Sequence, residues 1–190
     1  MEFVKKLEDR SYRTYKARLM AHRRLVLRNN AWNCSLIAFA TSTTVASVGI
    51  LIEKNMYGRG GDALMVALAI LSLVTSLVVS NMNYGARGRA MEANYKMIQQ
   101  ISAELESFFT GQGTDSWSKY HDIHRRYLNA VDSSENHSES DHFRNTQDSL
   151  SFKHRRKVRF DTSVTFFPVF TLAVPILVII PFILWFIRGL

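Results

Sequence analysis

Three long uncharged stretches interrupt a chain that is otherwise rich in charged residues. They cover residues 31–52, 63–82 and 164–187, which are 22, 20 and 24 residues long. A bilayer core of about 30 Å needs about 20 helical residues at about 1.5 Å each, so each stretch predicts a transmembrane helix. Burial of all three inside a soluble protein is disfavoured, because too few residues remain to cover helices of this length.

The segments outside these stretches predict further helices. Residues 2–30 contain no Gly or Pro, and no helix breaker separates them from residues 31–52, so one long helix is expected. Residues 86–131 predict two helices separated by Gly111 and Gly113. The expected apolar faces comprise Val4, Leu7, Ser11, Tyr15, Leu19, His22 and Val26; the stripe from Met91 to Phe109; and Trp117, Tyr120, His124, Tyr127 and Val131.

The connections complete the expected architecture. Residues 53–62 contain three glycines and are short enough to close the first two spans into a hairpin. Residues 132–152 are polar and predict a flexible tether, and residues 153–190 combine a basic segment with the third span. All three prolines lie in that span and predict kinks. The fold class is therefore an all-α integral membrane protein with a two-helix transmembrane hairpin, cytoplasmic helices and a third, C-terminal transmembrane helix.

The positive charge predicts the orientation of the chain in the membrane. The net charge is +8, with nine Lys and Arg residues in 1–30, twelve in 83–163 and two in 53–62. The positive-inside rule then places the N-terminus in the cytoplasm and the C-terminus outside, as in a multi-pass membrane protein. We expect contacts with lipid headgroups from the basic cluster Lys153, Arg155, Arg156, Lys157 and Arg159. Direct binding of nucleic acid is not expected, because no reader motif accompanies the charge.

The first two spans carry small and hydroxyl-bearing residues at helical spacing. Two stripes repeat every three or four residues: Ser35, Ala38, Ser42, Ala46 and Gly49 in the first span, and Ala69, Ser72, Ser76, Ser80 and Asn83 in the second. The first span has a second polar edge, Asn33, Thr41, Thr44 and Ser47. Such residues serve close helix packing, self-assembly or the lining of a pore. Packing within the hairpin is favoured for either stripe alone, but one hairpin cannot cover every polar face, which points to a homo-oligomer.

Residues that would support catalysis are scarce. The spans lack Asp, Glu, Lys, Arg and His, which argues against ion-coupled transport. His121, Asp122 and His124 do not form a recognised zinc motif, and residues 41–44 have no general base beside them. The single cysteine, Cys34, lies in the first span and has no partner for an intrachain bridge. The sequence therefore predicts no enzyme, no cofactor and no metal site.

Three ordered blocks resemble the SLATT-domain family. They are residues 12–19 with His22-Arg23-Arg24 and Asn29-x-x-Trp32-Asn33; residues 40–49; and Asn83-Tyr84-Gly85-x-Arg87, continuing through Met91, Asn94-Tyr95, Ile98-Gln99 and Ile101-Ser102 to Glu104. The blocks cover roughly residues 10–110, and the version present is similar to the branch found beside reverse transcriptases. A SLATT-like domain is therefore expected over residues 1–131, with the C-terminal third as an addition to the family plan.

The resemblance implies a function. These families are two-transmembrane effectors of prokaryotic conflict systems, so it implies an oligomer that permeabilises the inner membrane after a cytoplasmic trigger, causing growth arrest or cell death in anti-phage defence. The partner would be a reverse transcriptase or a nucleotide-signalling protein. The alternative is a scaffold without a pore, which recruits an enzyme through a cytoplasmic face formed by Tyr95, Ile98, Leu105, Phe109, Trp117 and Tyr120. A membrane tether that binds nucleic acid through residues 1–30 is the least favoured reading.

Overall fold

The structure is a computed structural model that describes residues 2–110, 116–133 and 167–189. Its labelled helices are α1 (Glu2–Ile52), α2 (Gly61–Met82), α3 (Tyr84–Thr110), α4 (Ser116–Asp132) and α7 (Ala173–Gly189). The described residues form helices and turns without a strand, so the predicted all-α class is confirmed. As predicted, α1 continues without a break from residues 2–30 through residues 31–52.

The chain divides into two compact units, which we name by composition. The polar unit comprises Met1–Val26 and Gly85–Asp161, and the apolar unit comprises Leu27–Tyr84 and Thr162–Leu190. The predicted tether (132–152) and basic segment (153–163) lie outside the described residues, apart from Asp132 and Ser133.

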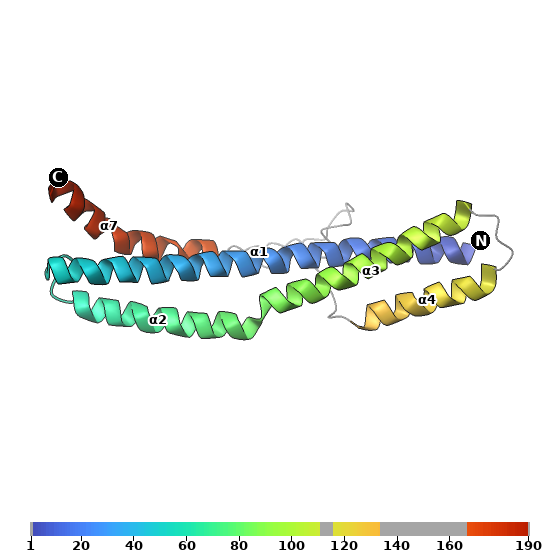
Figure 1. Cartoon of the computed structure of the whole chain (residues 1–190), viewed down its shortest axis with the longest axis horizontal. Coiled ribbons are helices and arrows are strands. Elements are labelled where there is room, and N and C mark those ends of the chain that lie inside the picture. Colours follow the sequence, from blue (N-terminus) through green and yellow to red (C-terminus); the bar gives the residue numbers. More distant parts are fainter. Residues whose placement is uncertain (1, 111–115, 134–166, 190) are drawn as a thin grey trace, which may run out of the picture. The chain divides into compact units, whose positions relative to one another are not determined.

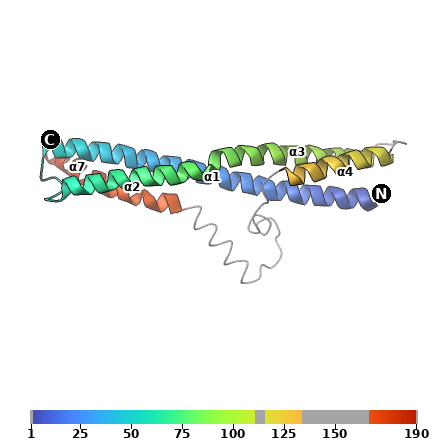
Figure 2. The same ribbon diagram turned by 90° about the horizontal axis from the view of Figure 1, so that it is seen from below.

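The polar unit is a three-helix bundle, in which α3 and α4 run beside the N-terminal part of α1 (Figures 1 and 2). Its core joins Val4 and Leu7 of α1, Ile98, Ile101 and Leu105 of α3, and Ile123, Tyr127 and Ala130 of α4. Amphipathic helices pack in this way because each buries one stripe against the other two.

The predicted stripe of α1 is correct in its first turns and shifts after them. Val4, Leu7 and Ser11 are buried, and Tyr15 packs half-buried against the core. Further along, Leu19 and His22 are half-buried and Val26 is exposed, whereas the fully buried positions are Ala17, Arg18, Ala21 and Leu25. In α4, Tyr127 is buried as expected, but Trp117 is 63% exposed and Ile123 occupies the core.

Asn83 separates α2 from α3. Its backbone is left-handed (φ 50°, ψ 36°), and it is the one non-glycine residue with a positive φ in the described part of the chain. Asn tolerates this conformation better than most residues, and its N–H donates to the carbonyl of Ser80 at 3.2 Å. The helix of the second span therefore ends at Met82, the last residue of the uncharged stretch 63–82.

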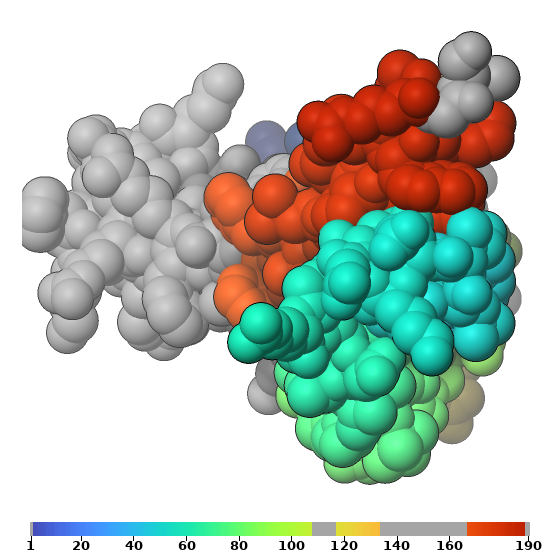
Figure 3. All heavy atoms as spheres, turned by 90° about the vertical axis from the view of Figure 1, so that its left-hand side faces the viewer, coloured from blue at the N-terminus to red at the C-terminus, as the bar shows by residue number. Residues whose placement is uncertain are grey.

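The apolar unit packs three helices around a small core. Ala46 of α1 meets Met65 and Leu68 of α2, and Ile50, Tyr57, Val174 and Val178 pack against them. The C-terminal part of α1 lies between α2 and α7 (Figure 3). By length and composition, three helices in the described part of the chain are able to cross a membrane: one ending at Ile52, one beginning at Gly61, and Phe167–Arg188.

The third span contains a break and a bend, as its prolines predict. Residues 167–171 are helical, Leu172 is a turn, and α7 begins at Ala173. Pro175 accounts for the break, because a proline ring obstructs the carbonyl four residues earlier, here that of Thr171. Pro181 lies inside α7, and the end of this helix turns away from α1 (Figure 1).

Candidate functional site

The small-residue stripe of the first span lies inside the apolar unit. Ser35, Ser42, Ala46 and Gly49 are all buried. The hydroxyl of Ser35 lies 2.6 Å from that of Thr171, which itself donates to the carbonyl of Pro168. A methyl group on Gly49 would lie 2.7 Å from the sulfur of Met56 and 3.0 Å from a ring carbon of Phe182. This face is therefore occupied by helix packing within one chain.

The polar edge of the first span lies on the opposite side of the helix. Its members Asn33, Thr41, Thr44 and Ser47 are all exposed. Thr44 is two residues from both Ser42 and Ala46, and at about 100° per residue it points about 160° away from each. Thr41, Thr44 and Ser47 donate to backbone carbonyls one turn earlier, at 2.9, 2.8 and 2.8 Å. Their oxygens still have lone pairs for a neighbouring donor or for water.

The stripe of the second span borders the packed face of α2 without belonging to it. The buried residues of α2 are Gly61, Met65 and Leu68. Ser72 is half-buried, whereas the other members of the stripe are exposed: Ala69, Ser76, Ser80 and Asn83. The two stripes therefore do not face each other across the hairpin, although their spacing is the same.

Hydrogen bonds and ring contacts join the third span to the first two. Besides the Ser35–Thr171 bond, the Tyr57 hydroxyl donates to the carbonyl of Val178 at 2.7 Å. The ring centroids of Trp32 and Phe167 lie 6.1 Å apart. These contacts engage the third span from its first residues to its middle, so it packs as a member of the apolar unit.

The predicted cytoplasmic face divides between core and surface. Ile98 and Leu105 are fully buried in the polar unit and are not available to a partner, while Tyr95 and Tyr120 are half-buried. Tyr95 contacts the rings of Tyr15 and His22. The side chain of Phe109 lies outside the described residues.

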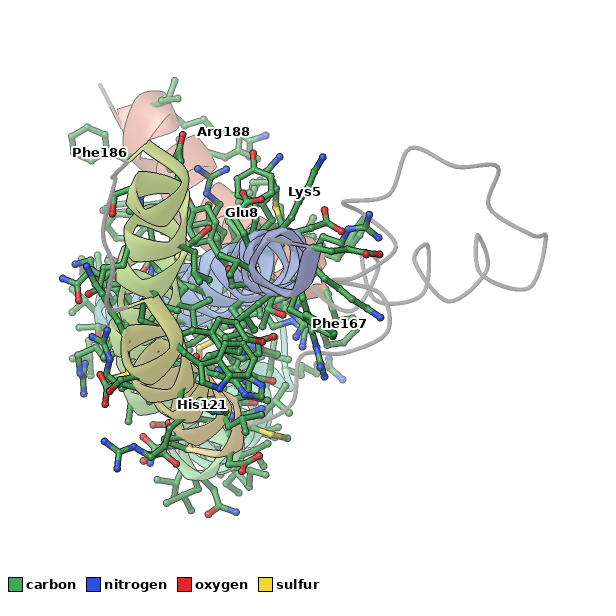
Figure 4. The ribbon with its side chains drawn as sticks, turned by 90° about the vertical axis from the view of Figure 1, so that its right-hand side faces the viewer. Lys5, Glu8, His121, Phe167, Phe186 and Arg188 are labelled. Atoms are coloured by element: carbon green, nitrogen blue, oxygen red, sulfur yellow. The ribbon has the colours of Figure 1, made fainter. Side chains whose placement is uncertain are left out.

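The exposed part of this face is an aromatic ladder on α4. The rings of Trp117 and Tyr120 stack at 5.5 Å, Tyr120 stacks on His124 at 5.8 Å, and His121 meets the edge of Trp117 at 4.9 Å. His121, labelled beside α4 in Figure 4, is exposed. A second feature is a cavity of about 510 Å³ between α1 and α3, with Tyr12 and Lys16 on one wall and Glu106 on the other. Both features belong to the polar unit alone.

Arg18 forms a buried polar centre that sequence reasoning missed. Its side chain is 1% exposed. Its guanidinium donates to the Asn94 side chain and, at 2.9 Å each, to the carbonyls of Ala130 and Val131 at the end of α4. Asn94 also donates to the carbonyl of Ala130 at 2.6 Å. A cation is favourable at a helix C-terminus, where unpaired carbonyls concentrate negative charge.

The physical state of Arg18 follows from these contacts. Burial lowers the pKa of its guanidinium, and the nearby Tyr127 partly offsets the effect. Its three acceptors are neutral, so the charge is compensated by oriented dipoles instead of a carboxylate. Both Arg18 and Asn94 belong to the blocks that carried the family resemblance, which was the available signal for their role.

Two questions raised by the sequence concern metal binding and contact with lipid headgroups. Within the described residues, no group of three or more His, Cys, Asp or Glu side chains is arranged to hold a metal ion. The basic cluster Lys153, Arg155, Arg156, Lys157 and Arg159 lies outside the described residues.

Comparison with known proteins identifies one family. The chain matches the family described as SMODS and SLOG-associating 2TM effector domain family 5 over residues 1–187. No curated protein and no solved structure gives a match. The matched range includes the tether, the basic segment and the third span. The match therefore covers the C-terminal third as well as residues 1–131.

Proposed function

Because the chain belongs to the SMODS and SLOG-associating 2TM effector domain family 5, we propose that it is a homo-oligomeric effector of a prokaryotic inner membrane. In this proposal it permeabilises the membrane when a cytoplasmic trigger acts on the polar unit. The observation that carries the proposal is the polar edge of the first span, which the other helices of the apolar unit leave exposed.

The polar edge suits contact between copies better than contact with lipid alone. Lipid tails offer no hydrogen-bond partner, whereas a neighbouring helix does, and interhelical hydrogen bonds in membranes contribute about 0.6–2 kcal/mol each. Several copies with Thr41 and Thr44 turned inward would line a pore with hydroxyl groups. The opposite face of the same helix packs against α2 and α7. That face therefore holds the helices of one copy together, while the polar edge is available for contact between copies.

The distribution of charge supports a cytoplasmic polar unit. Residues 1–30 and 83–163 carry 21 of the 24 Lys and Arg residues, and the positive-inside rule favours the cytoplasm for such segments. The aromatic ladder and the cavity between α1 and α3 are the surfaces on which a trigger would act. The trigger would come from a reverse transcriptase or from a nucleotide-signalling protein.

The test is the membrane potential of bacteria that express the full chain with its neighbouring genes, followed with a potential-sensitive dye during phage challenge. Wild type should depolarise the membrane. Thr41→Val/Thr44→Val should abolish depolarisation, because valine keeps the shape and removes the hydroxyls.

The matched control is Thr43→Val/Thr75→Val. These half-buried threonines also donate to carbonyls of their own helices, at 2.8 and 2.7 Å, but lie off the polar edge. The control should depolarise like wild type. If the wild-type protein protects cells without depolarisation, the pore hypothesis is wrong. That result would favour the scaffold, in which the aromatic ladder recruits an enzyme.

A further inference from the structure

We propose that the polar unit carries a binding site for the headgroup of an anionic phospholipid, formed by Arg23, Arg24, Arg87 and Arg89. We call these four residues the arginine collar. The site concerns lipid recognition and needs only that the apolar unit spans the membrane. Its failure would therefore be separate from a failure of permeabilisation.

The first support is the kind of charge that borders the spans. Residues 17–30 and 83–90 precede the first span and follow the second, and together they contain six arginines, no lysine and no acidic residue. All three lysines of α1 lie further from the membrane, at positions 5, 6 and 16. Arginine, unlike lysine, presents a planar fork that binds a phosphate through two hydrogen bonds.

The second support is that the structure brings the two segments together. The carbonyl of Gly88 lies 2.9 Å from Nδ1 of His22, which must donate this bond because a carbonyl only accepts. Gly88 is buried, and a methyl group there would lie 3.7 Å from the Cβ of Leu25. The close approach of α3 to α1 thus occurs between Arg87 and Arg89, beside Arg23 and Arg24.

The third support is accessibility at the right depth. Arg23, Arg87 and Arg89 are exposed and Arg24 is half-buried. Arg24 lies seven residues before the first uncharged stretch, about 10 Å along the helix. The headgroup region extends several ångströms beyond the hydrocarbon core, and a long arginine side chain reaches back toward it. A phospholipid phosphate is therefore the anion that the collar meets in the membrane.

The test uses native mass spectrometry of the full chain in a neutral detergent, titrated with phosphatidylglycerol or phosphatidylcholine. Wild type should retain phosphatidylglycerol at lower lipid concentrations than phosphatidylcholine. Arg23→Gln/Arg89→Gln should raise the phosphatidylglycerol concentration needed for half occupancy about ten- to thirty-fold.

The control Lys5→Gln/Lys6→Gln removes the same charge from exposed positions at the far end of α1, where Lys5 points away from α3 and α4 (Figure 4). It should bind like wild type. Equal retention of the two lipids by wild type, or equal losses in the two double variants, would overturn the site. Arg23→Lys/Arg89→Lys keeps the charge and should bind with intermediate affinity. Affinity equal to wild type would overturn the role of the guanidinium fork.

Discussion

The two units of this chain differ in how much of their apolar side-chain surface they bury. In the polar unit, large side chains such as Ile98, Leu105 and Ile123 are completely buried, and so is the hydrogen-bonded Arg18. In the apolar unit, the buried hydrophobic cluster that joins the spans contains only Ala46, Met65 and Leu68, and the other buried positions of the first span include small ones such as Ser35, Ser42 and Gly49. Only 28%, 11% and 11% of the residues in the most apolar parts of the three candidate spans are buried.

This difference shows where each unit obtains its stability. The polar unit removes its own apolar surface from water and has the core of a soluble bundle. The apolar unit leaves Leu51, Leu73 and Leu77 more than 60% exposed, which is costly in water and neutral in lipid. The polar unit is therefore stabilised by its own buried core, and the apolar unit by the lipid around it.

The largest expected effect comes from a truncation in the core of the polar unit. Leu105→Ala should lower the free energy of unfolding of this unit by about 2–5 kcal/mol, because it removes apolar contacts and leaves a cavity. Leu73→Ala, on the exposed face of α2, should cost less than about 1 kcal/mol. Hydrogen exchange of the α3 and α4 amides in the detergent-solubilised chain measures the first effect, and detergent-induced unfolding measures the second. Equal losses would remove the contrast between the units.

A smaller effect is expected at the buried arginine. Arg18→Met should destabilise the polar unit by about 1–3 kcal/mol, because it leaves Asn94 and the carbonyl of Val131 without a donor. Exchange should accelerate most in the last turns of α4. The control Arg13→Met removes an exposed pair with Asp9 and should cost less than about 1 kcal/mol. A neutral Arg18→Met would show that this network adds no stability.

The smallest effect tests whether the third span belongs to the bundle. Ser35→Ala removes the hydrogen bond to Thr171 and should cost about 0.6–2 kcal/mol. Detergent-induced unfolding, followed by tryptophan fluorescence, gives the difference, and a double-mutant cycle with Thr171→Val isolates the coupling. Ser47→Ala, on the polar edge, is the control and should show no coupling to Thr171. No coupling between Ser35 and Thr171 would leave the third span as an anchor only.

The sequence predicted the elements because each has a local cause. Uncharged length identifies the spans, the absence of Gly and Pro before Gly49 makes α1 continuous, and Pro175 breaks the third span. The faces were harder to predict, because helical spacing shows which residues share a side and not what covers that side. After Tyr15 the buried positions of α1 are therefore Ala17, Arg18, Ala21 and Leu25, and the predicted Leu19 and His22 are only half-buried.

The candidate site shows the same limit. The small-residue stripe of the first span could be read from its spacing, and the structure buries it. The same spacing in the second span lies beside the packed face, since Met65 and Leu68 contribute more apolar surface than serine. The burial of Arg18 was not predictable by composition, because its acceptors are mainly backbone carbonyls, which every residue has.

The choice of arginine at position 18 limits how α4 can be released. An arginine keeps its charge throughout the physiological pH range, even though burial lowers its pKa. A buried histidine or lysine in this place could lose its charge, and with it part of this interaction, by titration. The guanidinium of Arg18 instead keeps its hydrogen bonds to the end of α4 until another acceptor replaces the carbonyls of Ala130 and Val131. Release by this route is therefore a matter of competition between acceptors, and acidity of the surroundings has no part in it.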